Sequence, residues 1–456
     1  MNYLPRLIDS YLKEWAEKPD HKPLLLRGAR QVGKSSAVRH LGKSFKNFVE
    51  INFEKKSSYI KIFEEDLDVD RIVQDLSAIS GETIKDGETL LFLDEIQESP
   101  KAIMSLRFFR EDRPNLHVIA AGSLLEFTLE ELPTFGVGRI HSMFMFPMTF
   151  DEFLMANEEN RLIEIRNNSG IDRPLSVPLE EKLIRLFRTY IMVGGMPEVV
   201  DKWVSTKDYL SCQELLDDLL ISYETDFAKY KKKVDTVLLR NTLRSAALQL
   251  TSRFIYSRVS GNYKAYEVKN AIELLTQSGL IIPVKRTHAN GLPLGGEGRT
   301  DEMKLLILDS GLTLRLLKLS IGEDHELLSH ILTSPAQQLV NKGPLAEMIG
   351  GLEMLRYQTP NLQHELYYWA REERNSMAEI DYLLSPRGKI LPVEIKSGVQ
   401  GGMKSLWIFL KEKKLKMAVR SSLENFGIVT PPADNKDFKV IKCPLYAMSQ
   451  LWRLIE

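Results

Sequence analysis

The segment GARQVGKS, Gly28–Ser35, has the spacing G-x-x-x-x-G-K-[ST]. An apolar run, Leu24–Leu26, precedes it, and a helical pattern follows from Ser36. In this context the glycines let backbone N–H groups turn inward around a phosphate, and the positive end of the following helix faces the anion. We expect Lys34 to reach the β- and γ-phosphates of a nucleotide and the hydroxyl of Ser35 to bind Mg²⁺. The alternative is a glycine-rich turn before an amphipathic helix.

Two acids follow a second apolar run, Thr89–Leu93, in TLLFLDEIQ. A continuous apolar run of this length predicts a strand buried in a parallel sheet. Asp94 can complete the Mg²⁺ shell, and Glu95 can polarise the attacking water. The alternative is a strand that ends in two solvated acids.

Two further residues are candidates for the same site. Ser123 ends the run HVIAAGS, where its hydroxyl could sense the γ-phosphate or simply cap a helix. Arg139, in GVGRIH, could act as an arginine finger in cis or in trans, or be a surface arginine beside a glycine turn. The predicted catalytic residues are Glu95, Lys34 and Arg139. The predicted nucleotide-binding residues are Gly28, Ala29, Arg30, Gln31, Val32, Gly33, Lys34, Ser35, Ser36 and Ser123, and the predicted metal ligands are Ser35 and Asp94.

A second set of chemical groups lies near the C-terminal end, in ILPVEIKSG. Side chains two residues apart in a strand share a face, so Glu394 and Lys396 project together. The turn sequence SPRG joins this run to AEIDYLL and brings Asp381 toward the pair. Upstream, GPLAEMIGGLEML predicts a helix that carries Glu347.

This set resembles the core of restriction-endonuclease-like nucleases. The resemblance implies that the carboxylates hold a divalent metal and that the lysine orients the attacking water, with Glu379 as an auxiliary acid. Hard oxygen ligands suit Mg²⁺, which offsets charge on a phosphodiester. One alternative is a buried salt bridge with Lys396 in a fold that no longer cuts, and the other is a coincidence of exposed charges. The possible second site is therefore Glu347, Asp381, Glu394 and Lys396.

The elements that position these groups predict an α/β chain. Apolar runs at 47–54, 117–123 and 144–148 alternate with helical stretches, so residues 1–150 are predicted to form a doubly wound parallel sheet of the P-loop type. Residues 151–234 are predicted to be helical, and residues 330–456 to form the nuclease-like domain.

Between them, residues 235–320 show two helices followed by a hairpin with a glycine-rich tip, which is the order of a winged helix. Arg286, His288 and Arg299 would lie on the wing and could contact nucleic-acid phosphates. Many winged helices instead bind protein or join domains.

Composition argues against several classes of protein. The net charge of −1 over 456 residues makes no electrostatic case for nucleic acid, although a basic patch on one domain could hide in that average. Two cysteines are too few for a disulfide framework or a thiolate zinc site, which suits a reducing cytoplasm. No run approaches the roughly 20 apolar residues that a membrane helix needs, so no membrane partner is expected.

The segments GARQVGKSS, LFLDEIQ, AAGSLLEF, GRIHSMFMFPMTFDEFL and GGMPEVV resemble AAA-type P-loop ATPases of bacteria and archaea whose C-terminal half is a domain of unknown function. The similarity runs from about Leu4 to the end of the chain. It implies ATP and Mg²⁺ as cofactors and hydrolysis of ATP, with no established substrate. A threonine commonly follows the loop lysine, and this chain has the chemically equivalent Ser35.

Two functions fit these observations. The first is an ATP-driven switch or motor whose C-terminal module acts on DNA or RNA. The second is a signalling or scaffolding ATPase whose nuclease-like domain is inactive and binds a protein or DNA partner. A homo-oligomer is compatible with both.

Overall fold

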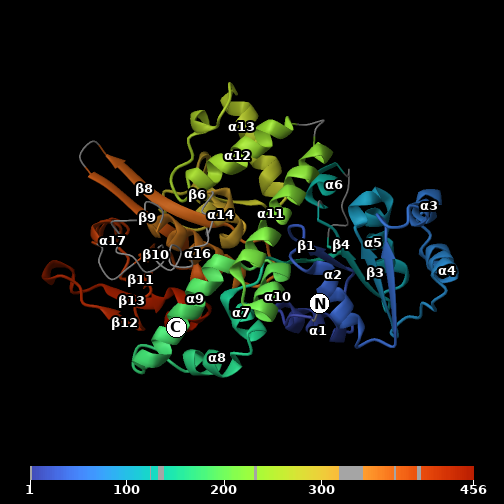
Figure 1. The fold of residues 1–456 in the computed structure, drawn as a ribbon, viewed down its shortest axis with the longest axis horizontal. Coiled ribbons are helices and arrows are strands. Elements are labelled where there is room, and N and C mark those ends of the chain that lie inside the picture. The colour runs from blue at the N-terminus through green and yellow to red at the C-terminus, as the bar shows by residue number, and fades with distance from the viewer. Residues whose placement is uncertain are drawn as a thin grey trace. The chain divides into compact units, whose positions relative to one another are not determined.

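A computed structural model describes residues 3–123, 125–131, 138–230, 234–317, 342–373, 376–397 and 402–456 (Figure 1). The contacts separate two units. Unit 1 comprises Met1–Met148, Gln277–Leu280 and Thr359–Gln363, and unit 2 comprises Thr149–Thr276, Ile281–Gln358 and His364–Glu456.

Unit 1 is built on a parallel sheet with the order β2-β3-β4-β1-β5. The strands are β1 Leu24–Arg27, β2 Asn47–Asn52, β3 Thr89–Asp94, β4 His117–Ala121 and β5 His141–Phe144. Every residue of β3 and β4 is buried, so helices must cover both faces of the sheet. The doubly wound parallel sheet predicted from the alternating runs is confirmed.

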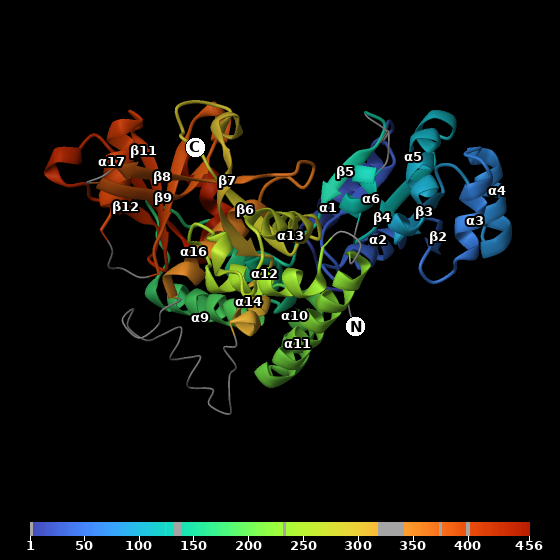
Figure 2. The ribbon, with the colours of Figure 1, turned by 90° about the horizontal axis from the view of Figure 1, so that it is seen from above.

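The helices of unit 1 are α1 Ile8–Glu17, α2 Lys34–Gly42, α3 Ser58–Glu65, α4 Val69–Ser80, α5 Pro100–Asp112 and α6 Leu125–Glu131. Apolar side chains of α3, α4 and α5 share one core with β2, β3 and β4. Figure 2 shows α3 and α4 beside β2. Since β4 lies between β3 and β1, the carboxyl ends of these three strands meet at one edge of the sheet.

The last strand of unit 1 ends earlier than the run at 144–148 suggested. β5 covers His141–Phe144, and only one further ladder-like bond follows, from Met145 N to Arg27 O at 2.8 Å. Pro147 has no N–H to continue the ladder, which explains the difference.

Unit 2 begins with helices and ends in a mixed sheet. Its helices are α7 Phe150–Ala156, α8 Asn160–Asn167, α9 Val177–Val193, α10 Pro197–Thr206, α11 Tyr209–Asp226, α12 Thr236–Leu248, α13 Ala265–Gln277, α14 Ser310–Leu316, α16 Lys342–Arg356, α17 Lys404–Glu412 and α18 Leu451–Leu454. Its strands are β6 Ile281–Arg286, β7 Arg299–Ile307, β8 Leu366–Glu373, β9 Ser376–Leu384, β10 Leu391–Ile395, β11 Met417–Ser422, β12 Gly427–Val429 and β13 Lys439–Pro444.

The eight strands of unit 2 form one sheet in the order β12-β13-β11-β10-β9-β8-β6-β7. The hairpin β6–β7 follows two helices, as the sequence predicts, but β6 also pairs in parallel with β8. The hairpin is therefore part of the C-terminal sheet. The antiparallel pair β9–β10 is joined by the SPRG turn, as predicted, with Leu384 opposite Leu391.

A buried polar network fixes helix α16 in unit 2. Glu353, 1% exposed, accepts hydrogen bonds from Tyr190 Oη at 2.8 Å and from Phe150 N at 3.1 Å. Arg356 donates to Tyr190 Oη and to Leu308 O, both at 2.7 Å. These bonds join α16 to the ends of α7, α9 and β7.

Asp309 extends this network to the GGMP turn between α9 and α10. Its carboxylate accepts from Gly195 N at 2.6 Å and from Leu312 N at 3.1 Å, which also caps α14. Burial raises the pKa of Asp309, and Arg356 offsets part of that shift. A side chain at Gly194 would not fit, because φ is +79° and its Cβ would lie 2.2 Å from Asp309 Oδ1.

We predict that Asp309→Ala lowers the free energy of unfolding by about 3 kcal/mol, because it leaves two buried N–H groups without acceptors. The matched control is Asp235→Ala, which removes an exposed cap of α12 and should cost only about 1 kcal/mol. Urea unfolding of the two variants measures the difference. Equal losses would show that the Asp309 network does not stabilise unit 2.

Candidate functional site

The loop between β1 and α2 has a backbone that requires glycine. Gly28 has φ of +141°, and a Cβ there would lie 2.1 Å from Met145 O. Gly33 precedes α2 with φ of +98°. Both values lie in the region that side chains disfavour, so the two glycines are needed for the loop to form.

Lys34 turns its side chain back onto this loop. Its ammonium donates to Gly28 O at 2.8 Å and to Ala29 O at 2.7 Å, and the residue is 7% exposed. Burial lowers the pKa of Lys34 to about 8, while Glu95 and Asp94 act in the opposite direction. These two acids offset only part of the effect of burial, so a phosphate would add a compensating negative charge where Lys34 is buried.

Ser35 and Asp94 are brought together at the carboxyl edge of the sheet. Ser35 Oγ donates to Asp94 Oδ1 at 3.0 Å, and Asn52 Nδ2 donates to Asp94 Oδ2 at 3.1 Å. Burial raises the pKa of Asp94 despite these bonds. A carboxylate and a hydroxyl are hard oxygen donors, so the pair fits Mg²⁺. Asn52 was missed from the sequence, although it ends the run NFVEIN and pairs with Asp94 in the ladder.

Glu95 follows β3 in a left-handed conformation, with φ of +52° and ψ of +44°. This conformation is uncommon for a residue with a side chain and is typical of functional positions. Gln97 Nε2 donates to Glu95 Oε2 at 2.8 Å. Gln97 Oε1 is buried and has no hydrogen-bond partner among the described residues, and a Cβ at Gly122 would lie 2.1 Å from it. Gln97 was also missed, because only the two acids of LFLDEIQ were considered.

The other residues predicted for this site have diverse surroundings. Ser123 is buried just after β4. Arg139 is 46% exposed and pairs with Glu111 of α5, which also pairs with Arg107 at 3.2 Å. Of the remaining residues predicted for nucleotide binding, Ala29 and Val32 are buried, Arg30 is half-buried, and Gln31 and Ser36 are exposed.

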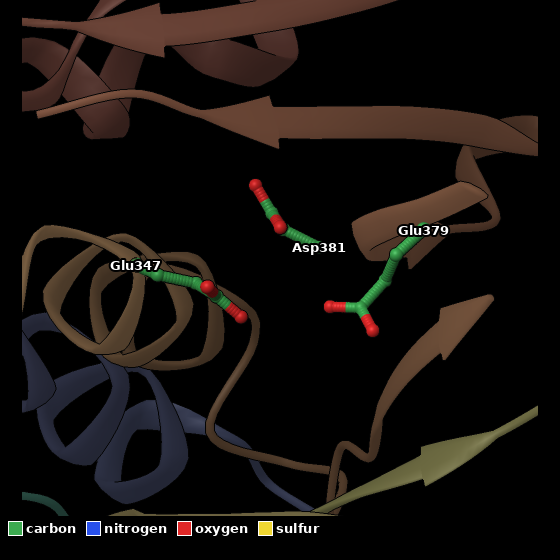
Figure 3. Close-up of side chains that lie close together, drawn as sticks. All are labelled: Glu347, Glu379 and Asp381. Carbon is green, nitrogen blue, oxygen red and sulfur yellow. The ribbon is translucent and has the colours of Figure 1, made fainter. Parts of the chain in front are cut away.

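Three carboxylates gather in unit 2, and we call them the carboxylate cluster: Glu347 on α16, and Glu379 and Asp381 on β9. One oxygen from each lies within 4.8 Å of the others. Figure 3 shows the three side chains pointing toward a common space from the helix and the strand. The predicted approach of Glu347 to Asp381 is thus observed, and Glu379 joins them.

A bulge in β9 contributes to this arrangement. Tyr367 of β8 pairs with Leu383, whereas Trp369 pairs with Ile380, so β9 carries one extra residue there. Ile380 and Leu383 both pack in the core beside α17. Tyr382 Oη donates to Glu347 O at 2.8 Å. A bulge redirects side chains, and here it turns Asp381 and Tyr382 toward α16.

Lys304 of β7 enters the carboxylate cluster, and the sequence did not single it out. Its ammonium lies 2.8 Å from Glu347 Oε1 and 2.5 Å from Glu379 Oε1, and the side chain is 1% exposed. Burial disfavours the charged form of Lys304, but the neighbouring carboxylates favour it more strongly, so the pKa of Lys304 is raised. Burial, followed by repulsion from Asp381, raises the pKa of Glu347 to about 8.

Glu394 and Lys396 form an ion pair beside the cluster. Glu394 is 4% exposed, and its Oε2 has no hydrogen-bond partner in the described part of the chain. Burial, followed by repulsion from Asp381, raises the pKa of Glu394 to about 8. Asp381 Oδ2 accepts from Ile395 N at 2.7 Å, which links the two strands. The three-carboxylate set that lies within metal-binding reach nevertheless contains Glu379 and not Glu394.

The prediction that Arg286 is available to phosphates is wrong. Arg286 is 7% exposed, pairs with the buried Glu302 and donates to Ala370 O at 2.7 Å. The cause is the pairing of β6 with β8, which encloses the side chain. His288 is exposed, and the side chain of Arg299 lies outside the described part of the chain.

Comparisons with known proteins agree with the geometry of unit 1. A family model described as an AAA domain matches residues 20–154. This part of the chain is therefore similar to an AAA domain. Two models described as domains of unknown function, DUF8612 and DUF4143, match residues 184–342 and 342–446. Among curated proteins, none matches significantly.

Several solved structures are similar at low identity. A Walker-type ATPase of Pyrococcus abyssi is 18% identical with a TM-score of 0.44, over 69% of this chain and 96% of that chain. The ORC1 protein of Aeropyrum pernix, solved in complex with DNA, is 15% identical with a TM-score of 0.30, over 70% and 94%. The RuvB branch migration motor of Thermotoga maritima is 14% identical with a TM-score of 0.28, over 60% and 85%. These likenesses are too distant to carry an inference about function.

The match of the AAA domain supports binding and hydrolysis of ATP. Within the described residues, no helix is both long enough and apolar enough to cross a membrane.

We predict that Gly28→Ala lowers nucleotide affinity at least about tenfold, because both its φ and the contact with Met145 O force the loop to move. The matched control is Gly87→Ala, which also has positive φ, at +75°, but meets nothing within 4 Å. Titration with a fluorescent ATP analogue measures both affinities. An unchanged affinity in Gly28→Ala would show that the loop geometry does not govern nucleotide binding.

Proposed function

We propose that the chain is an ATP-hydrolysing switch or motor whose unit 2 acts on nucleic acid through a metal-dependent, nuclease-like centre. The observation that carries the ATPase part is the bond from Ser35 Oγ to Asp94 Oδ1, with Glu95 directly after Asp94. Within an AAA domain, Ser35 and Asp94 would supply a hydroxyl and a carboxylate for Mg²⁺, and Glu95 would supply a base, at one edge of the sheet.

The residues of unit 1 have distinct tasks in this proposal. Ser35 and Asp94 would hold Mg²⁺, which offsets phosphate charge when bound. Lys34 leaves the loop carbonyls and binds the β- and γ-phosphates. Glu95 accepts a proton from the attacking water, and Gln97 keeps the Glu95 carboxylate oriented through its 2.8 Å bond. Ser123, at the end of β4, would bind the γ-phosphate.

In unit 2, the element order supports the nuclease-like assignment. Helix α16 is followed by β8, β9 and β10, then by α17 and β11, and β10 runs parallel to β11. The same strands carry the acids and the lysine that resemble the nuclease core. The order α12, α13, β6 and β7 supports a winged helix in the same way. The predicted boundaries 1–150, 151–234, 235–320 and 330–456 remain our proposal for the domains.

The charges of the carboxylate cluster suit a divalent cation. When all groups are ionised, the three carboxylates and Lys304 have a net charge of −2, and Glu394 is neutralised by Lys396. Carboxylate oxygens are the ligands that Mg²⁺ and Mn²⁺ prefer. The buried Glu394 Oε2 offers one more acceptor beside Asp381.

A specific observation favours the second candidate, a scaffolding ATPase with an inactive nuclease-like domain. Lys304 already lies between Glu347 and Glu379, where it stabilises the acids without any metal. Cleavage of DNA or RNA with Mn²⁺ separates the two functions: the nuclease predicts cleavage that Asp381→Asn removes while ATP turnover stays unchanged. Absence of cleavage on both substrates, with and without ATP, would favour the scaffold.

We predict that Lys34→Ala removes most nucleotide affinity, because it deletes a cation that would bind the β- and γ-phosphates. Glu95→Gln should keep the affinity and slow hydrolysis at least about a hundredfold, since an amide cannot accept the proton from water. Lys43→Ala, at an exposed lysine just after α2, is the matched control and should change neither quantity. Equal loss of affinity in Lys34→Ala and Glu95→Gln would contradict these roles.

If Arg139 is a finger in trans, ATP turnover per subunit should rise with protein concentration as copies associate, and Arg139→Ala should abolish the rise. Arg107→Ala is the control, because Arg107 has the same partner, Glu111, and nearly the same exposure. A steady-state ATPase assay over a range of protein concentrations measures this. Turnover that does not depend on concentration would leave Arg139 without a role in trans.

A further inference from the structure

Lys304 places its ammonium directly against two members of the carboxylate cluster, with a hydrogen bond to Glu347 and an ion pair with Glu379. The ammonium contacts Glu347 and Glu379 at once and lies 5.0 Å above the ring of Tyr368. Burying a lysine that is 1% exposed costs free energy unless the ammonium is paired, and the two carboxylates provide this pairing.

The backbone of Lys304 is held in place while its side chain spans the distance to the acids. Lys304 pairs with Val284 of β6 and bridges to Arg253, so β7 is fixed on both sides. The acids come from other elements, α16 and β9. Since the Glu379 side chain is 47% exposed, the cluster is accessible to solvent on that side.

A divalent cation and this ammonium cannot occupy the cluster together. Mg²⁺ binds carboxylate oxygens at about 2.1 Å, and the cluster oxygens lie within 4.8 Å of one another. A cation between Glu347 and Glu379 would therefore overlap the position of Lys304 Nζ, which is 2.8 and 2.5 Å from the same residues. The two charges would also repel at contact distance.

We propose that Lys304 is a tethered cation that occupies the metal position of the carboxylate cluster and competes with a divalent metal ion for it. The inference rests on the proposed metal site. Its second, independent support is Glu394, which pairs with Lys396 through Oε1, whereas its buried Oε2 has no hydrogen-bond partner among the residues that the structure describes, as expected if a cation is still to be supplied. Binding of Mg²⁺ or Mn²⁺ then requires the Lys304 side chain to leave, so metal loading is linked to the β6–β7 hairpin.

The test compares Mn²⁺ affinity in the full chain by electron paramagnetic resonance. All proteins carry Asp94→Asn, so that the phosphate loop contributes no metal site. Lys304→Met should bind Mn²⁺ at least about tenfold more tightly than the protein with Lys304, because the competing charge is gone. Lys304→Arg keeps the charge and is the matched control, which should not gain affinity.

The three possible results of the Mn²⁺ measurement lead to different conclusions. Tighter binding in Lys304→Met alone, lost again when Asp381→Asn is added, supports competition. Equal affinities for Lys304 and Lys304→Met, both abolished by Asp381→Asn, would overturn competition and leave the metal site standing. No Mn²⁺ bound by any of these proteins would overturn the metal site itself, and the competition with it.

A second measurement on the unsubstituted protein does not depend on how the variants fold. Acetylation with acetic anhydride, read by mass spectrometry, should leave Lys304 unmodified without metal. With Mn²⁺ bound, Lys304 should become modified, whereas the exposed Lys389 should react equally in both conditions. Continued protection of Lys304 while Mn²⁺ is bound at the cluster would overturn the proposal.

Discussion

Buried carboxylates must be neutralised, and in unit 2 this requirement fixes helix α16. The N-terminal half of the helix carries Glu347, which faces Lys304 and the acids of β9. Its last turn carries Glu353 and Arg356, which bind Tyr190 and the carbonyl oxygen of Leu308. A helix held by buried charges in both halves cannot shift without leaving a charge unpaired, at a cost of several kcal/mol. The carboxylate cluster therefore sits on a rigid support, as a site that binds a metal needs.

The buried carboxylate of unit 1 has different surroundings. Asp94 receives hydrogen bonds from the neutral groups of Ser35 and Asn52, and Arg39 lies 3.9 Å from its Oδ2. These neutral donors orient the carboxylate and favour its charged form, but burial outweighs them and raises the pKa of Asp94. Asp94 is thus prepared for an incoming cation, whereas the acids of unit 2 already hold one. We infer that a metal ion can bind to Asp94 in unit 1 without displacing a cation, whereas in unit 2 it must first displace Lys304.

The sequence predicted those structural features that depend on residues close together in the chain. The phosphate loop and the two acids at the end of β3 lie in short motifs, and the parallel sheet follows from alternating apolar and helical runs. The SPRG turn was sufficient to place Asp381 near β10. What it could not predict depends on distant pairing: Lys304 is 43 residues from Glu347, and its approach follows from the parallel pairing of β6 with β8. The same pairing buries Arg286, which the winged-helix order of elements had placed on the wing. The bulge in β9 likewise has no local signal that separates it from a regular strand.

We infer two separate cation sites, one in each unit. Anomalous diffraction from crystals soaked with Mn²⁺ and a non-hydrolysable ATP analogue can locate both. We predict one manganese peak between Ser35, Asp94 and the phosphates, and a second peak within the carboxylate cluster with the Lys304 side chain moved away from Glu347. A single peak at the phosphate loop, with Lys304 still bound to Glu347 and Glu379 at saturating Mn²⁺, would contradict it.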